Sequence, residues 1–403
     1  MNPVSQAIDR PAPEGECGLY VHVPFCQTKC GYCDFYSIPL RGRSTRTLVE
    51  RVLRELAIRV PDCGYEISTV FFGGGTPTLL PLDELRSLLA AIGSLVQVPN
   101  LGEFTVEANP ATVDQSKAAL LVEHGVSRVS MGAQSFHPEE LLTLERVHNP
   151  DDIAPSVRIL REAGVRQVNL DLIFGIPGQS MQSWAESLRR AIGLGIDHIA
   201  CYGLTYEPGT ALTSQRDRGL IQPCDEELEA EMYLFTIETL EQAGLLQYEI
   251  SNFAKPGCES RHNLMYWRNH PYIGVGPSAV GYVKRRRYKN VPDAVRYVQL
   301  MDRDGHAETE SEFVDEGMEL MEMLLMHLRL NEGIPHDDFR QRAGTSPQAA
   351  LGETLSELVC RQLLEVDDHA LRLTRQGRLV ANTVMAELAA ALELGALGAC
   401  SQR

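Results

Sequence analysis

Two patterns alternate along residues 18–206. Six short runs are apolar and rich in β-branched residues, and the stretches between them have the spacing of amphipathic helices. Each strand and helix pair takes about 31 residues, the size of a strand, a crossover helix and two loops. The runs are GLYVHVPF, ISTVFFGGG, EFTVEAN, RVSMGAQS, QVNLDLIFG and HIACYGLTY, and the expected helices cover 44–59, 82–95, 113–124, 138–146, 152–163 and 181–193. This repetition predicts a parallel (β/α)6 barrel, which is partial because a complete eightfold barrel takes about 250 residues.

The ends of the predicted strands carry polar residues or glycine. A cysteine-rich loop follows the first strand and GGGTPT follows the second, while Glu107 lies on the third, Gln134 on the fourth and Asp171 on the fifth. Barrel enzymes build their sites at this face. Turn residues alone explain the glycines and an Asn-Pro pair, but they explain poorly an amide and two acids on three successive strands.

The chain is predicted to have four segments. Residues 1–17 are a lead-in and 18–206 the barrel. Residues 207–304 are an extension with a helix near 225–244, the apolar QYEISNF and a loop, HNLMYWRNHPYIGVGPSAVGY, and we expect it to close one side of the barrel. Residues 305–403 are helical and acidic, and LLEVDDHALRLTRQGRLVANTVMAEL predicts a strand hairpin feeding a helix, in a winged-helix-like domain.

Charge argues against nucleic acid as a partner. The 403 residues include 54 acidic and 37 basic side chains, a formal net charge of -17, which phosphate repels. The one basic run, KRRRYK at 284–289, is either a solvated surface or a site for carboxylates or phosphates.

Cysteine use and hydropathy favour a cytoplasmic protein. Ten cysteines in a chain of this length are too few for a disulfide scaffold. The opening MNPVSQAIDRPAPEGE lacks the apolar core of a secretory signal, and Glu387 and Glu393 interrupt the apolar C-terminal stretch. We therefore expect neither export nor a membrane span.

The segment CQTKCGYCDFY places Cys26, Cys30 and Cys33 within eight residues. Close thiols in a reduced protein are usually metal ligands, of structural zinc or of an iron-sulfur cluster. Zinc requires a fourth ligand, for which Cys17 or Cys63 is a candidate. A four-iron cluster held by three cysteines instead leaves one iron open to a reactant.

The cysteine spacing after the first strand, followed by GGGTP after the second, resembles the radical S-adenosylmethionine (SAM) superfamily. The resemblance implies a [4Fe-4S] cluster on Cys26, Cys30 and Cys33, whose unique iron is chelated by SAM. One electron from the reduced cluster then cleaves the sulfonium to a 5′-deoxyadenosyl radical. It also implies that the backbone at Gly74, Gly75 and Thr76 approaches the methionine end of SAM, where a side chain would collide.

Further SAM-site residues are implied by the same resemblance. Tyr20 and Tyr32 would flank the cluster and the cofactor, although a tyrosine at the position of Tyr20 is also typical of core packing. Glu107 would contact SAM. Three more residues would line the neighbouring strand ends and, in related proteins, can serve a second SAM molecule: Gln134, Arg146 and Asp171.

From LYVHVPFC through GVGPSAVGY, the chain resembles the oxygen-independent coproporphyrinogen III oxidase group, with FGGGTPT, MGAQSF and NLDLIFGIPGQ as that group has them. The true oxidases have Cys-x3-Cys-x2-Cys-x-Cys and a longer lead-in than the 25 residues before Cys26. Their last cysteine is replaced here by Phe35. The chain therefore departs from the oxidase pattern at a residue on which that subgroup relies.

A second subgroup, the HemW-type haem chaperones, is marked by His-Asn-x-x-Tyr-Trp, and this chain has HNLMYW at 262–267. The resemblance implies haem b as cargo, with His262, Tyr266 and Trp267 as candidate haem-binding residues. A neutral imidazole is a common axial ligand of haem iron, but a histidine among aromatic residues also commonly packs and forms hydrogen bonds. Cys258 is another candidate ligand.

Two functions of different class follow. One is a haem-transfer protein that keeps a cluster and an exchangeable SAM, with acceptor haem proteins, respiratory enzymes among them, and an electron donor as partners. The other is an enzyme that decarboxylates coproporphyrinogen III to protoporphyrinogen IX. Phe35 and HNLMYW favour the first. A third, a structural zinc protein, is weakened by the glycine loop and the strand-end acids.

Overall fold

The computed structural model describes the backbone of residues 15–400 and the side chains through residue 392. The chain forms two compact units. The barrel unit takes the residues up to Leu246 together with Ser251–His262 and Pro271–Glu312. The C-terminal unit takes Gln247–Ile250, Asn263–His270 and the chain from Phe313 onward.

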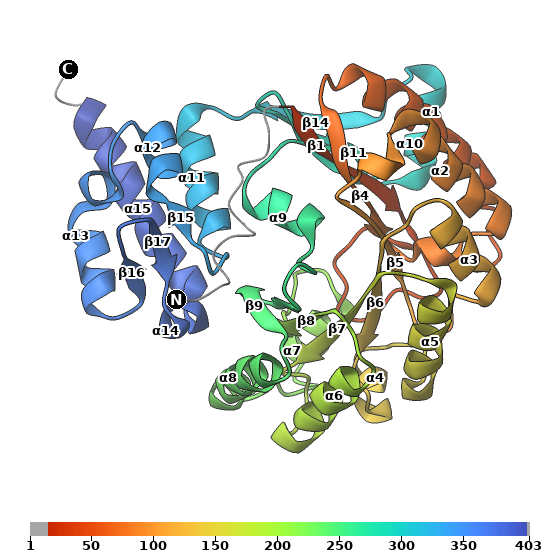
Figure 1. Ribbon diagram of the computed structural model, residues 1–403, viewed down its shortest axis with the longest axis horizontal. Helices are drawn as coiled ribbons and strands as arrows, with labels where there is room; N and C mark the ends of the chain where they lie inside the picture. Colours follow the sequence, from red (N-terminus) through yellow and green to blue (C-terminus); the bar gives the residue numbers. More distant parts are fainter. Residues whose placement is uncertain (1–14, 401–403) are drawn as a thin grey trace. The chain divides into compact units, whose positions relative to one another are not determined.

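Six parallel strands form the centre of the barrel unit, in the order β1-β4-β5-β6-β7-β8. They are β1 (Glu16–Val23), β4 (Glu66–Gly74), β5 (Glu103–Ala108), β6 (Arg128–Gln134), β7 (Gln167–Phe174) and β8 (His198–Gly203). Helices alternate with them along the chain, on the outside of the sheet (Figure 1): α1 (Arg46–Asp62), α2 (Leu82–Leu95), α3 (Gln115–Glu123), α4 (Pro138–Thr143), α5 (Ile153–Ala163) and α6 (Met181–Gly193). The predicted partial (β/α)6 barrel is confirmed.

Helix α2 shows why the crossover segments fold as they do. Its buried residues are Leu85, Leu88, Leu89 and Ile92, spaced at three, four and seven positions, so one stripe faces the sheet. Asp83 and Glu84 occupy its first turn, where acidic side chains interact favourably with the helix dipole. Full burial of each of these aliphatic side chains contributes about 1.5–3 kcal/mol.

The extension differs from the prediction of closure on one side, because it adds strands at both edges of the six. At the β1 edge, β11 (Tyr272–Val275) runs parallel to β1, followed by β12 (Val280–Val283), β13 (Arg286–Asn290) and β14 (Glu308–Phe313). At the β8 edge, β10 (Asn252–Ala254) pairs antiparallel. Its helices are α7 (Ala211–Asp217), the predicted α8 (Glu226–Gln242), α9 (Arg261–Trp267) and α10 (Ala294–Arg303).

The segment 262–282 was predicted as a loop, and that prediction is wrong. It contains most of α9 and the strands β11 and β12. Its glycines misled the prediction, because here they allow close packing within a sheet. A Cβ on Gly274 would lie 2.0 Å from the carbonyl oxygen of Val280, and one on Gly281 would lie 2.3 Å from the ring of Tyr288.

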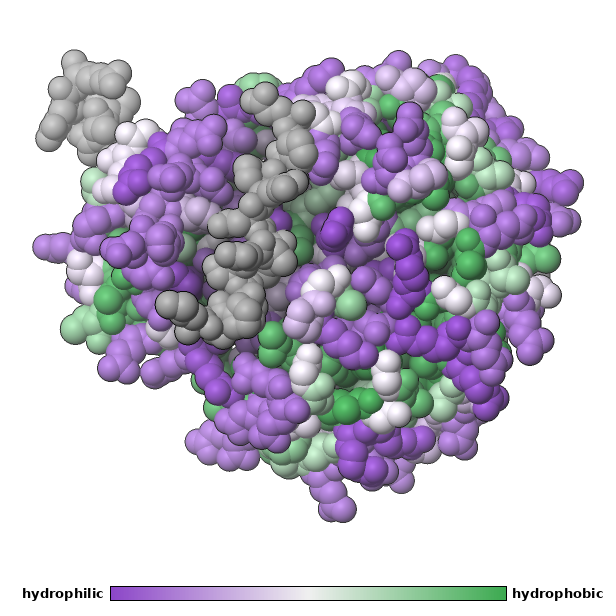
Figure 2. All heavy atoms as spheres, viewed as in Figure 1, coloured by the Kyte–Doolittle hydropathy of each residue, from purple (hydrophilic) through white to green (hydrophobic). Residues whose placement is uncertain are grey.

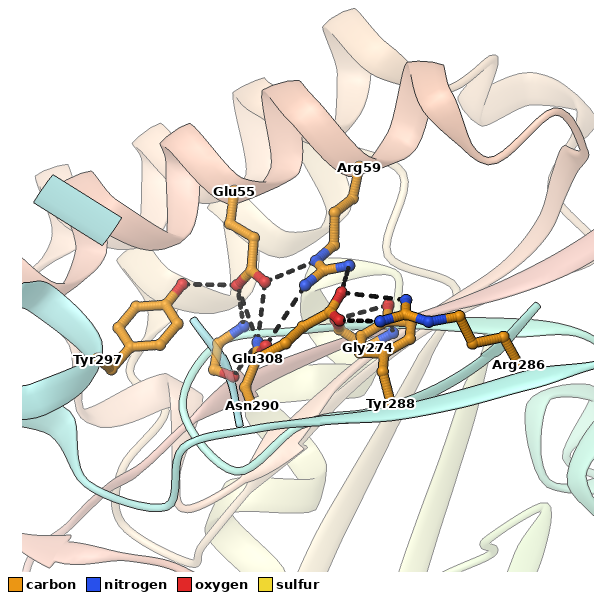
Figure 3. Close-up of polar contacts among 9 residues, drawn as sticks. Glu55, Arg59, Gly274, Arg286, Tyr288, Asn290, Tyr297 and Glu308 are labelled. Atoms are coloured by element: carbon orange, nitrogen blue, oxygen red, sulfur yellow. Dashed lines mark hydrogen bonds and ion pairs between the residues drawn. The ribbon is translucent and has the colours of Figure 1, made fainter. Parts of the chain in front are cut away.

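A buried polar network fastens the β11–β14 extension to α1 (Figure 3). The Glu55 carboxylate accepts hydrogen bonds from Arg59 Nε at 2.6 Å, Tyr297 Oη at 2.7 Å and Asn290 Nδ2 at 2.8 Å. It also accepts one from the backbone N–H of Gly276 at 2.8 Å. Side chains from α1, α10 and β13 thus share one carboxylate.

The C-terminal unit is a small helical domain with a three-stranded antiparallel sheet in the order β15-β17-β16. Its core includes Met323, Phe339, Leu355 and Leu371. The predicted hairpin feeding a helix is present as β16, β17 and the helices after them. The elements are β9 (Leu246–Glu249), which lies at the division between the two units, α11 (Glu316–His327), β15 (Ile334–Pro335), α12 (His336–Ala343), α13 (Pro347–Cys360), β16 (Leu364–Val366), β17 (Ala370–Leu373), α14 (Arg375–Leu379) and α15 (Ala381–Cys400).

The surface is mainly hydrophilic on the face shown in Figure 2. Within the described residues, no helix combines the length and the hydropathy that a membrane span requires. The basic run 284–289 forms the turn after β12 and most of β13, and two of its arginines pair with acidic residues of β14, Arg286 with Glu308 and Arg287 with Glu312. Because two of its charges are paired locally, the structure favours the solvated-surface interpretation of this run.

Candidate functional site

The three cysteines lie on one loop at the carboxyl end of β1. Cys26 closes β2 (Phe25–Cys26), which pairs with β3 (Ile38–Pro39), and the loop between the two strands carries Cys30 and Cys33. The backbone N–H of Leu40 donates to the carbonyl of Cys26 at 2.8 Å, and that of Cys33 to the carbonyl of Cys30 at 3.2 Å. All three thiols are free and half-buried. The fold therefore presents them together at the strand-end face.

The electrostatics of the thiols show that they are neighbours. Burial, with the charges of Cys30 and Cys26, raises the pKa of Cys33 to about 11, and burial also raises the pKa of Cys26. No three His, Cys, Asp or Glu side chains of the described residues are arranged to hold one metal ion. A [4Fe-4S] cluster does not need this convergence, because each cysteine binds a different iron.

The alternative fourth zinc ligands lie elsewhere. Cys17 is the second residue of strand β1, at the opposite end from Cys26, and it is fully buried. Its thiol donates to the carbonyl of Gly18, and Cys63 interacts with it electrostatically. The structure therefore does not bring either residue to the three thiols, and the zinc alternative loses its local support.

Arg146 stands beside the cysteine loop. Its Nη1 donates to Cys30 Sγ at 3.4 Å, and its Nη2 donates to the carbonyl of Gly132 at 2.6 Å and to Asn109 Oδ1. Its Nε is buried without a hydrogen-bond acceptor in the described part of the chain. A guanidinium here can offset the negative charge of a bound cluster. Free thiols, a fixed cation and an unsatisfied donor fit an iron-sulfur cluster.

Two carboxylates face the barrel interior next to this loop. Glu107 accepts a hydrogen bond from the backbone N–H of Gly74 at 3.1 Å, and burial together with the charge of Asp171 raises its pKa to about 8. Asp171 accepts one from Asn169 Nδ2 at 2.6 Å, and burial raises its pKa to about 6. Neither carboxylate forms a direct ion pair with a described residue, although the charges of Arg128 and Arg146 act on Asp171 and lower its pKa against the effect of burial. Such carboxylates suit a cationic ligand.

The remaining predicted SAM-site residues lie around the same strand ends. Tyr20 bonds through its hydroxyl to His22 Nδ1 at 3.0 Å. Tyr32 is partly buried near Arg146, Cys30 and Asp171, and desolvation raises its pKa. Gln134 has a φ of +62° at a bulge in β6, a strained conformation for a residue other than glycine. Thr76 accepts a hydrogen bond from Asn109 Nδ2 at 2.7 Å.

The fold itself requires glycine at positions 74 and 75, where β4 ends and the next loop begins. Gly74 has a φ of +95°, and a Cβ there would lie 2.2 Å from the ring of His22. A Cβ on Gly75 would lie 2.6 Å from the carbonyl oxygen of Val23 and 2.7 Å from that of Phe25. The expected reason for these glycines was close approach to SAM. The structure adds approach to the segment that leads into Cys26, so a bulky residue at Gly75 would disturb the cysteine loop as well.

The HNLMYW residues divide between the two units. His262 belongs to the barrel unit, where its ring is 1% exposed and burial lowers its pKa to about 3. Its Nδ1 bonds to Thr69 Oγ1 at 2.8 Å. Tyr266 and Trp267 belong to the C-terminal unit, where the Arg329 guanidinium lies 4.6 Å from the centroid of the Trp267 ring. In this conformation His262 is a packed, neutral imidazole.

Sequence reasoning missed residues that hold the predicted ones in place. His22 links Tyr20 to the cysteine segment, because its Nε2 bonds to the carbonyl of Tyr36 at 2.9 Å. Asn169 orients Asp171 and accepts from His198 Nδ1 at 2.6 Å. The sequence alternation of the strands could have identified these residues, because His22 lies two positions from Tyr20 and Asn169 two positions from Asp171, and residues two apart in a strand share a face.

Comparison with known proteins gives consistent results. Residues 20–191 match the radical SAM superfamily and residues 318–380 match the HemN C-terminal domain. The heme chaperone HemW of Bacillus subtilis is 34% identical over 367 residues, covering 91% of this chain and 97% of its own. That of Mycobacterium tuberculosis is 36% identical over 385 residues, covering 94% and 96%.

Relatives also occur in animals, and a solved structure shares the fold. The mitochondrial radical S-adenosyl methionine domain-containing protein 1 of Mus musculus is 32% identical over 401 residues, covering 94% of this chain and 89% of its own. The coproporphyrinogen III oxidase HemN of Escherichia coli superposes with a TM-score of 0.80 at 23% identity, covering 93% of this chain and 90% of its own.

Proposed function

The chain belongs to the radical SAM superfamily, in the HemN-like group that includes the heme chaperones HemW, and from this premise we propose that it is a haem chaperone. It binds haem and transfers it to acceptor haem proteins, and it carries a [4Fe-4S] cluster with exchangeable SAM. The observation that carries the proposal is the similarity over nine-tenths of the chain to proteins named heme chaperone HemW. A cytoplasmic location is part of it, supported by the free thiols.

In this proposal Cys26, Cys30 and Cys33 hold the cluster, and Arg146 offsets its charge through Cys30. When bound, the reduced cluster supplies one electron to the sulfonium of SAM. SAM carries a sulfonium and an ammonium group, and the carboxyl groups of Glu107 and Asp171, in their ionised forms, would complement these positive charges. The other proposed SAM-site residues are Tyr20, Tyr32, Gly74, Gly75, Thr76, Gln134 and Arg146.

The proposed haem site includes the HNLMYW segment, with His262, Tyr266 and Trp267 as candidates. Aromatic side chains can pack on a porphyrin face, and a neutral imidazole can bind iron. Because the His262 ring is buried here, axial ligation by His262 requires it to leave its position on Thr69. His262→Ala separates two roles. If His262 is an axial ligand, the substitution changes the haem absorption spectrum, whereas if the ring only packs, the spectrum is unaltered and stability falls by about 1–3 kcal/mol.

The alternative is coproporphyrinogen III oxidation, which the HemN fold also accommodates. Anaerobically reconstituted protein should therefore be assayed in parallel for haem binding and for turnover of coproporphyrinogen III. We expect one haem per chain and no meaningful conversion to protoporphyrinogen IX. Robust decarboxylation with SAM consumed in proportion would refute the chaperone function and favour the oxidase.

A further inference from the structure

The inward-facing side chains of the barrel unit form two layers that differ in exposure. Four residues of the upper layer are partly exposed: Tyr20, Phe71, Glu107 and Asp171. Residues of the lower layer are all at most 3% exposed: Thr69, Thr105, Asn169, His198 and His262. Inward side chains of a barrel normally fill it in layers. Here the interior is filled up to the lower layer and accessible above it, beside the cysteine loop.

His262 enters the lower layer from α9 and not from a barrel strand. Its backbone N–H donates to Glu103 Oε1 at 3.2 Å, and its Nδ1 bonds to Thr69 Oγ1 at 2.8 Å. Its ring stacks on Phe71 with centroids 5.2 Å apart and an interplanar angle of 28°. On the other side, a Cβ at Gly18 would lie only 3.1 Å from His262 Cε1, so glycine leaves just enough room for the ring.

Phe71 contacts both this ring and the ring of Tyr20 in the upper layer. Its own ring lies 6.1 Å from that of Tyr20, whose hydroxyl bonds to His22. His22 in turn bonds to the carbonyl of Tyr36, just after the cysteines. Phe71 Cε1 also lies 2.7 Å from where a Cβ on Gly73 would be, so it borders the glycine loop closely.

We propose that His262 is a positioning residue of the SAM and cluster pocket, whose ring fixes Phe71 and, through it, Tyr20 and the glycine loop. This role deepens the proposed function, since it rests on the SAM site that the function includes, and it does not depend on haem ligation by His262. The histidine of the HNLMYW motif would thus hold residues of the cofactor pocket in place. Close packing supports such a role, because a void below Phe71 would leave its ring free to shift.

The test compares SAM binding in three variants of the full, cluster-loaded chain under anaerobic conditions. His262→Ala removes the ring, and we expect SAM affinity to fall about tenfold. His262→Phe keeps an aromatic ring below Phe71 and should restore affinity to within about threefold of the wild type. Gly18→Ala leaves His262 in place but forces its ring to move by a few tenths of an ångström, so it should give an intermediate loss.

The electron paramagnetic resonance spectrum of the reduced cluster provides a second readout. SAM should change this spectrum in the wild type, and His262→Ala should need correspondingly more SAM for the same change. Leu88→Ala, on the buried face of α2, is the control for destabilisation, and it should leave SAM affinity unchanged.

Folded His262→Ala or Gly18→Ala protein with wild-type SAM affinity would overturn the proposal, as would an equal loss in Leu88→Ala. Haem binding is measured on the same samples. Wild-type protein that binds SAM but no haem would refute the chaperone function alone and leave the positioning role standing. Wild-type protein that binds no SAM would refute both.

Discussion

The barrel unit holds two clusters of charged side chains, one around the buried Glu55 and one around the partly exposed Glu107 and Asp171, and they differ in how the charges are satisfied. Glu55 is 1% exposed and accepts hydrogen bonds from a guanidinium, a phenol, an amide and a backbone N–H (Figure 3). Its partner Arg59 also pairs with Glu308 at 2.9 Å. Each charge in this cluster meets an opposite charge.

The strand-end cluster has the opposite character. Glu107 and Asp171 lie in the same part of the barrel without a salt bridge to a described residue, and their pKa values are raised to about 8 and about 6. Arg146 retains a buried Nε without an acceptor in the described part of the chain. Here neither carboxylate forms a direct ion pair with a described residue, although the charges of Arg128 and Arg146 act on Asp171.

The difference indicates which cluster serves structure and which serves a ligand. A carboxylate satisfied on every side stabilises the contact between segments and has nothing left to bind. Groups with strongly shifted pKa values in an accessible interior are typical of functional sites. The four predictions below test this distinction, beginning with the largest effect.

Replacement of Cys26, Cys30 and Cys33 by Ala should abolish the cluster completely, because no other described cysteine lies on that loop. Iron and acid-labile sulfide after anaerobic reconstitution should fall from about four each per chain to near zero. Replacement of Cys224 and Cys360 by Ala is the control and should preserve both. If the triple variant retained its iron and sulfide, the strand-end region around Glu107 and Asp171 would not be the cofactor site.

Glu55→Ala should lower the free energy of unfolding by about 3–5 kcal/mol, because it leaves Arg59, Tyr297 and Asn290 without the acceptor that they share. Chemical denaturation of the cluster-free protein measures this loss. Glu50→Gln on the same helix is the control, because its ion pair with Arg51 is exposed and contributes less than about 1 kcal/mol. If the two substitutions cost the same, the Glu55 network is not a structural anchor.

The sequence predicted most of this arrangement where one local pattern decided it. The six barrel strands and their helices follow from hydrophobic periodicity, and Glu107, Gln134 and Asp171 from their places at strand ends. The β11–β14 extension was missed because its glycines and aromatic residues have no clear period. Its glycines serve close packing between strands, as at Gly274, which depends on a partner that only the fold supplies.

The roles within the site were harder to predict than its location. His262 was a candidate haem ligand by its motif, yet its contacts with Thr69 and Phe71 join residues almost two hundred positions apart. Gly75 was expected to make room for SAM, but its nearest neighbours are the backbone atoms of Val23 and Phe25. Neither set of contacts has a local signature, because both depend on tertiary packing.

Glu107→Gln should stabilise the cluster-free protein in alkaline solution. Folding raises the pKa of Glu107 from 4.5 to about 8, so ionisation weakens the wild type as the pH rises from about 4.5 to about 8. The variant escapes this loss, which at about 1.4 kcal/mol per pKa unit amounts to at most about 5 kcal/mol above pH 8 and to nothing below pH 4.5. Denaturation curves at pH 4, 6 and 9 measure the difference.

Above pH 8, where the Glu107 carboxyl is ionised, the same substitution should weaken SAM binding, because it removes a negative charge that complements a cationic ligand. Glu123→Gln, an exposed change on α3, is the matched control and should alter neither stability nor binding. A Glu107→Gln protein that is no more stable at pH 9 than the wild type would show that the strand-end carboxylate is already satisfied, and the contrast with Glu55 would fail.

Arg287→Gln tests a charge that is paired at the surface, for which we expect the smallest effect. Arg287 pairs with Glu312 at 2.7 Å, with 24% and 49% of the two side chains exposed, so water and salt screen the pair. Its loss should cost less than about 1 kcal/mol, and less still at high salt. Because this charge is paired at the surface, haem and SAM affinities should stay unchanged. A tenfold loss of haem affinity would instead make the β12–β13 hairpin a site for porphyrin carboxylates, and local pairing would then no longer distinguish structural charges from binding charges in this protein.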